Sequence, residues 1–136
     1  MSPLARQRLG WGLAFFILLL LGASAFDKMS GSQHSLEMTT SFGIAPTTYR
    51  LLGVVELVSA ALFLVPRTAM LGLLLLASYL GGAIATHLQH GQSVAFPAAI
   101  EALVWGTAFV RNPRLFAPFP PPQLFTARSV PLPRRL

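Results

Sequence analysis

Four apolar stretches dominate this chain of 136 residues. They cover residues 9–26, 49–65, 69–87 and 94–110. The hydrocarbon core of a bilayer is about 30 Å thick, so a spanning helix needs about 20 mainly apolar residues and at least about 17. Each stretch is close to that length, and too few residues lie between the stretches to build a soluble domain. We therefore predict an all-α fold in which residues 1–115 form a four-helix transmembrane bundle.

Composition and charge placement support this class. Apolar residues make up 54% of the chain, charged residues only 10%, and the mean hydropathy is +0.63. The net charge is +6, yet four crossings would place eight of the ten basic residues on one face and only Lys28 and Arg50 on the other. By the positive-inside rule, both termini are then cytoplasmic. We attribute the basic charge to membrane topology and expect no nucleic-acid partner.

The first stretch also resembles a secretory signal peptide. Arg6 and Arg8 precede it, and residues 23–25 (Ala-Ser-Ala) resemble a cleavage site. Asp27 and Lys28 follow directly and make an interfacial stop, so we interpret the stretch as an uncleaved first helix. The expected location is the bacterial cytoplasmic (inner) membrane, as a multi-pass protein. The chain has no cysteine, which excludes disulfides and thiol-based redox chemistry on it.

The connections predict which helices are neighbours. In the longest loop, Ser32 can cap a short helix through residues 33–38, with Gly43 ending it. Residues 66–68 (Pro-Arg-Thr) make a very tight turn, so the second and third stretches are expected to be antiparallel neighbours. The short turn at residues 88–93 predicts the same for the third and fourth stretches.

Small residues recur at every fourth position of the last two stretches. This spacing lets helix backbones approach closely where lipid supplies no hydrophobic drive between helices. We expect these stripes to hold the bundle together. They are Ser78, Gly82 and Thr86, then Gly81 and Ala85, and finally Ala98, Ala102 and Gly106.

Two carboxylates fall inside the predicted spans at similar depth. At about 1.5 Å per residue, Glu56 and Glu101 lie about 9 and 10 Å from the same outer face. A charged carboxylate at mid-membrane costs about 2.5–3.5 kcal/mol, so each should face the bundle interior, protonated or paired. The sequence predicts a polar pocket in the outer half of the bundle, formed by Asp27, Glu56, His87, Glu101 and Trp105. The alternative is that these groups only satisfy one another and fix the helix register.

Two histidines, His87 and His90, are three residues apart and can share a helical face. Without a nearby third ligand they are a weak metal signal, so we interpret them as hydrogen-bonded interfacial imidazoles and expect no metal. Axial ligation of a haem or chlorophyll by one of them stays open. The sequence contains no nucleophile–base pair, phosphate-binding glycine loop or metal cluster that would support hydrolytic or phosphoryl chemistry.

Three runs resemble the DoxX-like family of small four-helix membrane proteins. They are residues 53–57 (Gly-Val-Val-Glu-Leu), 64–69 (Leu-Val-Pro-Arg-Thr-Ala) and 79–87 (Tyr-Leu-Gly-Gly-Ala-Ile-Ala-Thr-His). The resemblance covers residues 10–115 and implies a four-helix bundle, with Glu56 and His87 at positions that match the family pattern. The family name refers to a subunit of an archaeal thiosulfate:quinone oxidoreductase, so a role near quinone is implied by analogy alone.

The C-terminal tail, residues 116–136, departs from that family. It is rich in proline, phenylalanine and arginine, and we expect an extended, polyproline-like cytoplasmic segment. Such a segment has little entropy left to lose, and its large side chains can anchor it to a partner. The predicted partner-binding residues are Phe116, Phe119, Phe125, Arg128, Arg134 and Arg135.

These features predict a non-catalytic accessory subunit of a larger respiratory, photosynthetic or other redox membrane complex. The tail and one face of the bundle would hold it there, within the lipid bilayer. The first alternative is a quinone-interacting subunit of a membrane oxidoreductase, with Glu56 and Glu101 offering hydrogen bonds or protons to the quinone. A small proton-coupled permease fits least, because no inverted repeat is evident. The sequence identifies no cofactor; quinone and lipid are the candidates, and no metal or thiol-based cofactor is expected.

Overall fold

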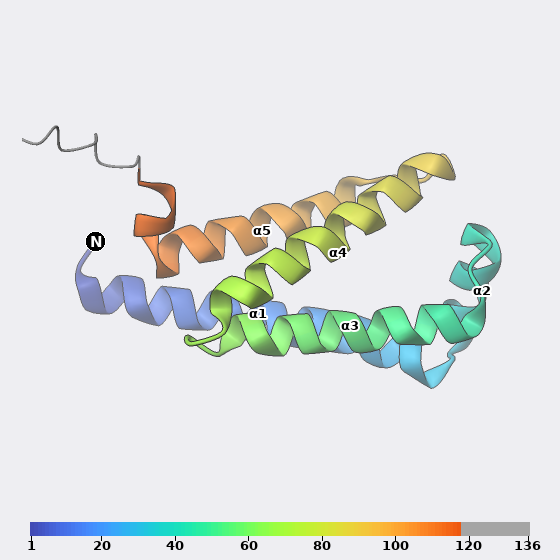
Figure 1. Cartoon of the computed structure of the whole chain (residues 1–136), viewed down its shortest axis with the longest axis horizontal. Helices are drawn as coiled ribbons and strands as arrows, with labels where there is room; N and C mark the ends of the chain where they lie inside the picture. Colours follow the sequence, from blue (N-terminus) through green and yellow to red (C-terminus); the bar gives the residue numbers. More distant parts are fainter. Residues whose placement is uncertain (118–136) are drawn as a thin grey trace, which may run out of the picture.

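The computed structural model describes residues 1–117, which form five α-helices and a short 3-10 helix (Figure 1). The elements are α1 (Pro3–Ser30), α2 (Gln33–Phe42), α3 (Pro46–Leu64), α4 (Ala69–Gln89), α5 (Ala95–Arg111) and η1 (Pro113–Phe116). Of the predicted tail, Phe116 lies in η1 and Ala117 follows it. Phe119, Phe125, Arg128, Arg134 and Arg135 lie outside the described residues.

Local signals in the sequence explain where the first helices begin. The Ser2 hydroxyl accepts a hydrogen bond from the Ala5 amide, and proline occupies the first turn of both α1 and α3, where its missing N–H costs nothing. Ser32 caps α2 by accepting from the Ser35 amide. The short helix predicted after Ser32 is therefore confirmed, and it continues as far as Phe42.

Three of the described helices, α1, α3 and α4, are long and apolar enough to cross a membrane. The helix α1 has 28 residues and extends beyond the predicted stretch 9–26 at both ends. This is expected of a spanning helix, because helical hydrogen bonds continue into the polar interface after the apolar residues end. The helix α5 is shorter, with 17 residues.

The helices α1, α3, α4 and α5 pack around a common centre, each against two neighbours in the cyclic order α1, α3, α4, α5. The predicted neighbour pairs α3–α4 and α4–α5 are thus confirmed. Figure 1 shows α1 and α3 side by side, whereas α4 meets α3 at the turn between them and then diverges from it toward the end where α2 lies. The two helices are thus close together at the end with their connecting turn and further apart at the other end.

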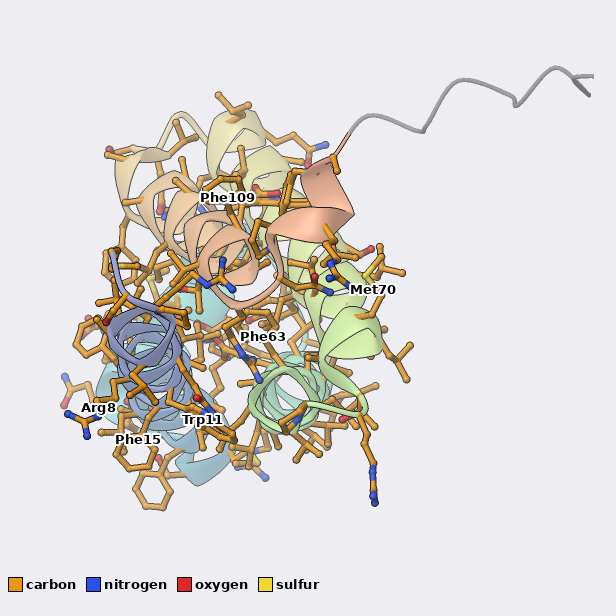
Figure 2. The ribbon with its side chains drawn as sticks, turned by 90° about the vertical axis from the view of Figure 1, so that its left-hand side faces the viewer. Arg8, Trp11, Phe15, Phe63, Met70 and Phe109 are labelled. Atoms are coloured by element: carbon orange, nitrogen blue, oxygen red, sulfur yellow. The ribbon has the colours of Figure 1, made fainter. Side chains whose placement is uncertain are left out.

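The core lies between these four helices. Phe63 points into the centre and is 1% exposed (Figure 2), and Ile17, Leu76 and Val104 pack in the same cluster. Phe15 and Met70, by contrast, point outward (Figure 2) and are about half exposed. Such broad apolar outer faces are typical of helices that contact lipid. The bilayer is therefore the environment that this surface fits.

The close contact between α3 and α4 is made by a glycine outside the predicted stripes. A Cβ atom at Gly72 would lie 2.2 Å from the Phe63 backbone nitrogen, so α4 touches the backbone of α3 there. At Gly81, Gly82 and Gly106, a Cβ atom would meet no atom within 4 Å in the described part of the chain. The prediction that those stripe glycines hold the bundle together is therefore wrong. A small-residue spacing defines a smooth helix face, but it does not determine which neighbour covers that face.

Arg111 connects three helices at the end of the bundle that holds the chain's N-terminus. Its guanidinium donates to the backbone oxygens of Phe63 and Leu64, over 2.5 and 2.9 Å, and so satisfies carbonyls at the C-terminus of α3. It also lies over the rings of Trp11 and Phe63, 5.5 and 5.4 Å from their centroids. A single cation of α5 thereby fixes the ends of α1 and α3.

Candidate functional site

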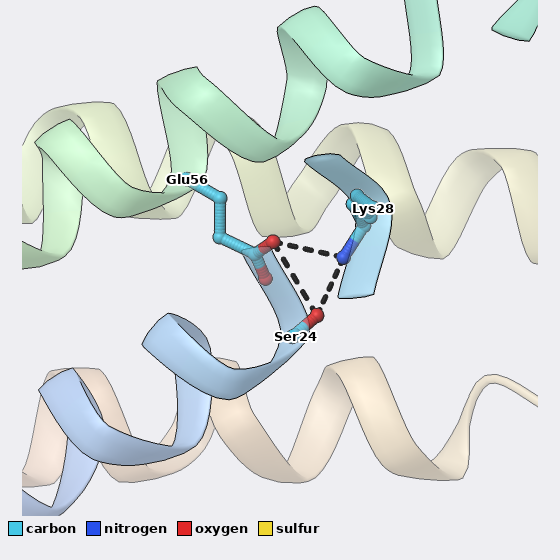
Figure 3. A network of polar contacts seen from close by, with 3 residues as sticks. All are labelled: Ser24, Lys28 and Glu56. Carbon is cyan, nitrogen blue, oxygen red and sulfur yellow. Dashed lines mark hydrogen bonds and ion pairs between the residues drawn. The ribbon is translucent and has the colours of Figure 1, made fainter. Parts of the chain in front are cut away.

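A buried ion pair joins α1 to α3. Lys28 Nζ lies 2.8 Å from Glu56 Oε2 and also donates to Ser24 Oγ, one turn earlier on α1. The Ser24 hydroxyl in turn donates to Glu56 Oε2 over 3.3 Å, which closes a triangle of polar contacts (Figure 3). The Glu56 residue is 2% exposed. This carboxylate therefore faces the bundle interior and is paired, as a charge at this depth requires.

Close packing of α1 on α3 makes this pairing possible. Gly53 lies one turn before Glu56, and a Cβ atom there would be 2.9 Å from the Ala25 carbonyl oxygen and 3.0 Å from Lys28 Cβ. Only the absence of a side chain lets the two backbones approach so closely. Lys28, which the sequence places at the end of the first span, can then reach back to Glu56.

The ion pair lies in the wall of a cavity of about 610 Å³. All five α-helices contribute to the lining, which is mainly apolar, with Leu52, Leu80 and Ile100 among its residues. Val55 and Leu75 also line it and remain exposed. The cavity is therefore accessible along the side where α4 diverges from α3, which is the lipid-facing side of a spanning protein.

Polar groups converge on this cavity from four helices. Tyr49 and Glu56 come from α3, Tyr79 and His87 from α4, and Lys28 from α1. Lys28 Nζ lies 5.8 Å from the Tyr49 ring centroid, so the same cation contacts both Glu56 and an aromatic face. His34 comes from α2. An apolar cavity with a few convergent hydrogen-bonding groups is the usual form of a small-molecule site.

The two predicted histidines lie at the mouth of the bundle beside α2. Phe42 packs against both imidazoles, with ring centroids 5.0 Å from His87 and 5.4 Å from His90. Nδ1 of each ring is 2.8 Å from the backbone oxygen four residues earlier, Ala83 or Thr86. Within residues 1–117, no three His, Cys, Asp or Glu side chains gather as metal ligands.

The predicted polar pocket maps onto this arrangement only in part. Glu56 and His87 line the cavity, whereas Asp27, Glu101 and Trp105 are not among its lining residues. Asp27 accepts a hydrogen bond from the Ser32 hydroxyl between α1 and α2. Glu101 is half-buried on α5. Trp105 is 39% exposed and packs edge-on against Phe116 at 6.1 Å. Membership of these three residues in a functional pocket stays a prediction.

The sequence-based pocket omitted several polar lining residues, among them Ser24 and Tyr79. Each of these two carried a usable signal. Ser24 precedes Lys28 by four residues, which places both on one helical face, and Tyr79 precedes His87 by eight residues, two turns along the same face of α4. Searching each predicted span for polar residues one or two turns from an ionisable residue would have found both.

A model described as the DoxX-like family matches residues 12–107. This range covers well over half of the chain and includes the whole cavity-lining part of α3, α4 and α5. The resemblance noted in the sequence is thereby confirmed. Comparisons with curated proteins and with solved structures give no match.

Proposed function

Because the chain belongs to the DoxX-like family and has apolar spanning helices, we propose that it is a multi-pass membrane protein that binds a lipophilic molecule with a hydrogen-bonding head group. A quinone has this chemistry, with a polar head group and an apolar tail. The observation that carries the proposal is the cavity of about 610 Å³ with the Lys28–Glu56 pair in its wall. Ligand pockets typically measure about 300–1,000 Å³.

The lining residues suit such a head group. Quinone oxygens accept hydrogen bonds, and Lys28 and the hydroxyls of Tyr49 and Tyr79 can donate them. The Glu56 carboxylate can accept from the hydroxyls of the reduced form. When bound, a quinone supplies two-electron, two-proton redox chemistry, and the chain would hold and orient it. The apolar walls and the exposed edge at Val55 and Leu75 leave a path for an isoprenoid tail into the lipid.

The test is binding of a short-chain ubiquinone analogue to the full-length protein in nanodiscs, measured by native mass spectrometry. We expect Tyr79→Phe and Glu56→Gln each to weaken binding about tenfold, since a hydrogen bond to a charged or buried group is worth about 1–3 kcal/mol. Glu101→Gln is the matched control, because Glu101 does not line the cavity. Circular dichroism checks that each variant is folded. Equal affinity in all four proteins would refute the proposal.

The accessory-subunit function is a second candidate, favoured by the uncovered small-residue faces of α4 and α5. Gly81, Gly82 and Gly106 lie exposed, and such positions allow another helix to pack closely. The tail would add further contacts. We expect deletion from Ala117 onward, or Gly106→Leu, to release the protein from a larger complex in gently extracted native membranes; Gly106 does not line the cavity. Gly12→Leu, at an exposed glycine of α1, is the control. Unchanged stoichiometric co-migration of both altered forms would exclude this role.

The membrane arrangement is part of the proposal. We infer that α5 makes a fourth crossing, because its 17 residues meet the lower length limit and it packs along both α1 and α4. Both termini then lie in the cytoplasm by the positive-inside rule, and the bacterial inner membrane is the proposed location.

A further inference from the structure

A second cavity, of about 280 Å³, lies where α3 ends, α4 begins and α5 ends. Its lining begins on α3 at Phe63, about two turns beyond Glu56, and it shares no lining residue with the larger cavity. Arg67, Arg111 and Asn112 form its polar side, and Phe63, Met70 and Leu115 are among its apolar residues. A site that is cationic on one side and apolar on the other fits an amphipathic anion.

Charge at this end of the bundle has one sign. Besides Arg67 and Arg111, the N-terminal part of α1 and the η1 turn bring further arginines to it, namely Arg6, Arg8 and Arg114. Of the four acidic residues of the chain, Asp27 lies in the last turns of α1, Glu37 in α2, Glu56 at the middle of α3 and Glu101 in the first half of α5, and none of them lines this cavity. Within the described residues, an anion here would therefore meet cations without a competing carboxylate.

Arg111 is held in position for such an anion. Its hydrogen bonds to Phe63 and Leu64 use two of its five N–H groups, and both acceptors are neutral carbonyls. Its positive charge is therefore not cancelled by these contacts. Arg67 lies exposed in the turn between α3 and α4, where a flexible side chain can close on a ligand from the other side. Arginine recognises phosphate through two parallel hydrogen bonds.

We propose that this cavity binds the phosphate head group of an anionic phospholipid, with Arg67 and Arg111 as cationic ligands and Asn112 as a hydrogen-bond donor. The apolar residues of the cavity lead to α4, whose outer face exposes Met70, Leu71 and Leu74 to receive the acyl chains. A free phosphate ion has no apolar part that could contact these side chains. The apolar residues beside the arginines therefore favour a lipid over free phosphate. Basic pockets between membrane helices recognise anionic head groups in this way.

The experiment titrates the delipidated full-length protein in detergent with phosphatidylglycerol or phosphatidylcholine of identical acyl chains, and counts bound lipid by native mass spectrometry. We expect the wild type to retain phosphatidylglycerol at least about tenfold more strongly than phosphatidylcholine. Arg67→Gln should weaken phosphatidylglycerol binding about fivefold, the usual effect of one basic residue near an anionic surface. Arg50→Gln is the control, because Arg50 is also exposed but lies at the start of α3, at the opposite end.

Three outcomes would overturn the proposal. Equal retention of the two lipids would mean that the charge of the head group is not recognised, and equal loss in the Arg67 and Arg50 variants would mean that the attraction is not local to this cavity. Displacement of phosphatidylglycerol by millimolar inorganic phosphate that binds equally well alone would assign the cavity to free phosphate. Because Arg67 lies in an exposed turn, its substitution leaves the packed core untouched.

Discussion

Within residues 1–117, Lys28 and Glu56 form an ion pair in which the carboxylate side chain is 3% exposed and the lysine side chain 13% exposed. Removing one partner leaves the other as an uncompensated charge in apolar surroundings, which typically costs about 3–5 kcal/mol. We therefore predict that Lys28→Met lowers the free energy of unfolding by about 3 kcal/mol. Equilibrium unfolding of the purified protein in mixed micelles, followed by circular dichroism, measures this quantity.

The double variant Lys28→Met with Glu56→Leu separates loss of the pair from loss of packing. Replacing both charges by apolar groups is often neutral, so we expect the double variant to recover most of the stability lost in the single one. Glu37→Gln, on the exposed face of α2, should change little. A double variant as unstable as Lys28→Met would contradict the interpretation of the pair as mutually compensating charges.

Among the helices, α4 contains two glycines with opposite surroundings. An added Cβ at Gly72 would overlap the backbone of α3 at Phe63, whereas one at Gly82 would meet nothing within 4 Å in the described structure. Overpacking of a close contact costs about 1–3 kcal/mol, and here the obstructing atoms are backbone, which moves least. We predict that Gly72→Ala destabilises the protein by at least about 2 kcal/mol, measured in the same unfolding assay.

Gly82→Ala is the matched control in the same helix. Alanine has a helix propensity about 1 kcal/mol better than glycine, so this variant should be neutral or slightly more stable. If Gly82→Ala proved the more harmful substitution, the small-residue stripe would hold α4 against another helix after all, and the Gly72 contact would not be the principal α3–α4 crossing.

For the whole molecule, the main prediction concerns its path through the membrane. The absence of cysteine makes single introduced cysteines specific reporters. We predict that Ser2→Cys and Ala117→Cys react with a membrane-impermeant maleimide only from the cytoplasmic side, and Thr47→Cys and Ser93→Cys only from the outside. Because Ser93 and Ala117 flank α5, labelling of both from the same side would show that α5 does not cross the bilayer.

Several features could be predicted from the sequence because they depend on local chemistry. Apolar length indicated the membrane class and the helices, Ser32 indicated the start of α2, and the tight turn at residues 66–68 indicated that α3 and α4 are neighbours. The runs around Glu56 and His87 indicated the DoxX-like family. Each of these properties is encoded within a few consecutive residues or one helical turn.

The composition of the cavity could not be predicted in the same way. Matched depth placed Glu56 and Glu101 together, yet Glu56 pairs with Lys28 and lines the cavity, while Glu101 does not line it. Depth follows from counting residues along one helix, but the direction in which a side chain points depends on how that helix is rotated against its neighbours. That rotation, and the splay of α4 from its close contact at Gly72, arise from packing between residues far apart in the chain.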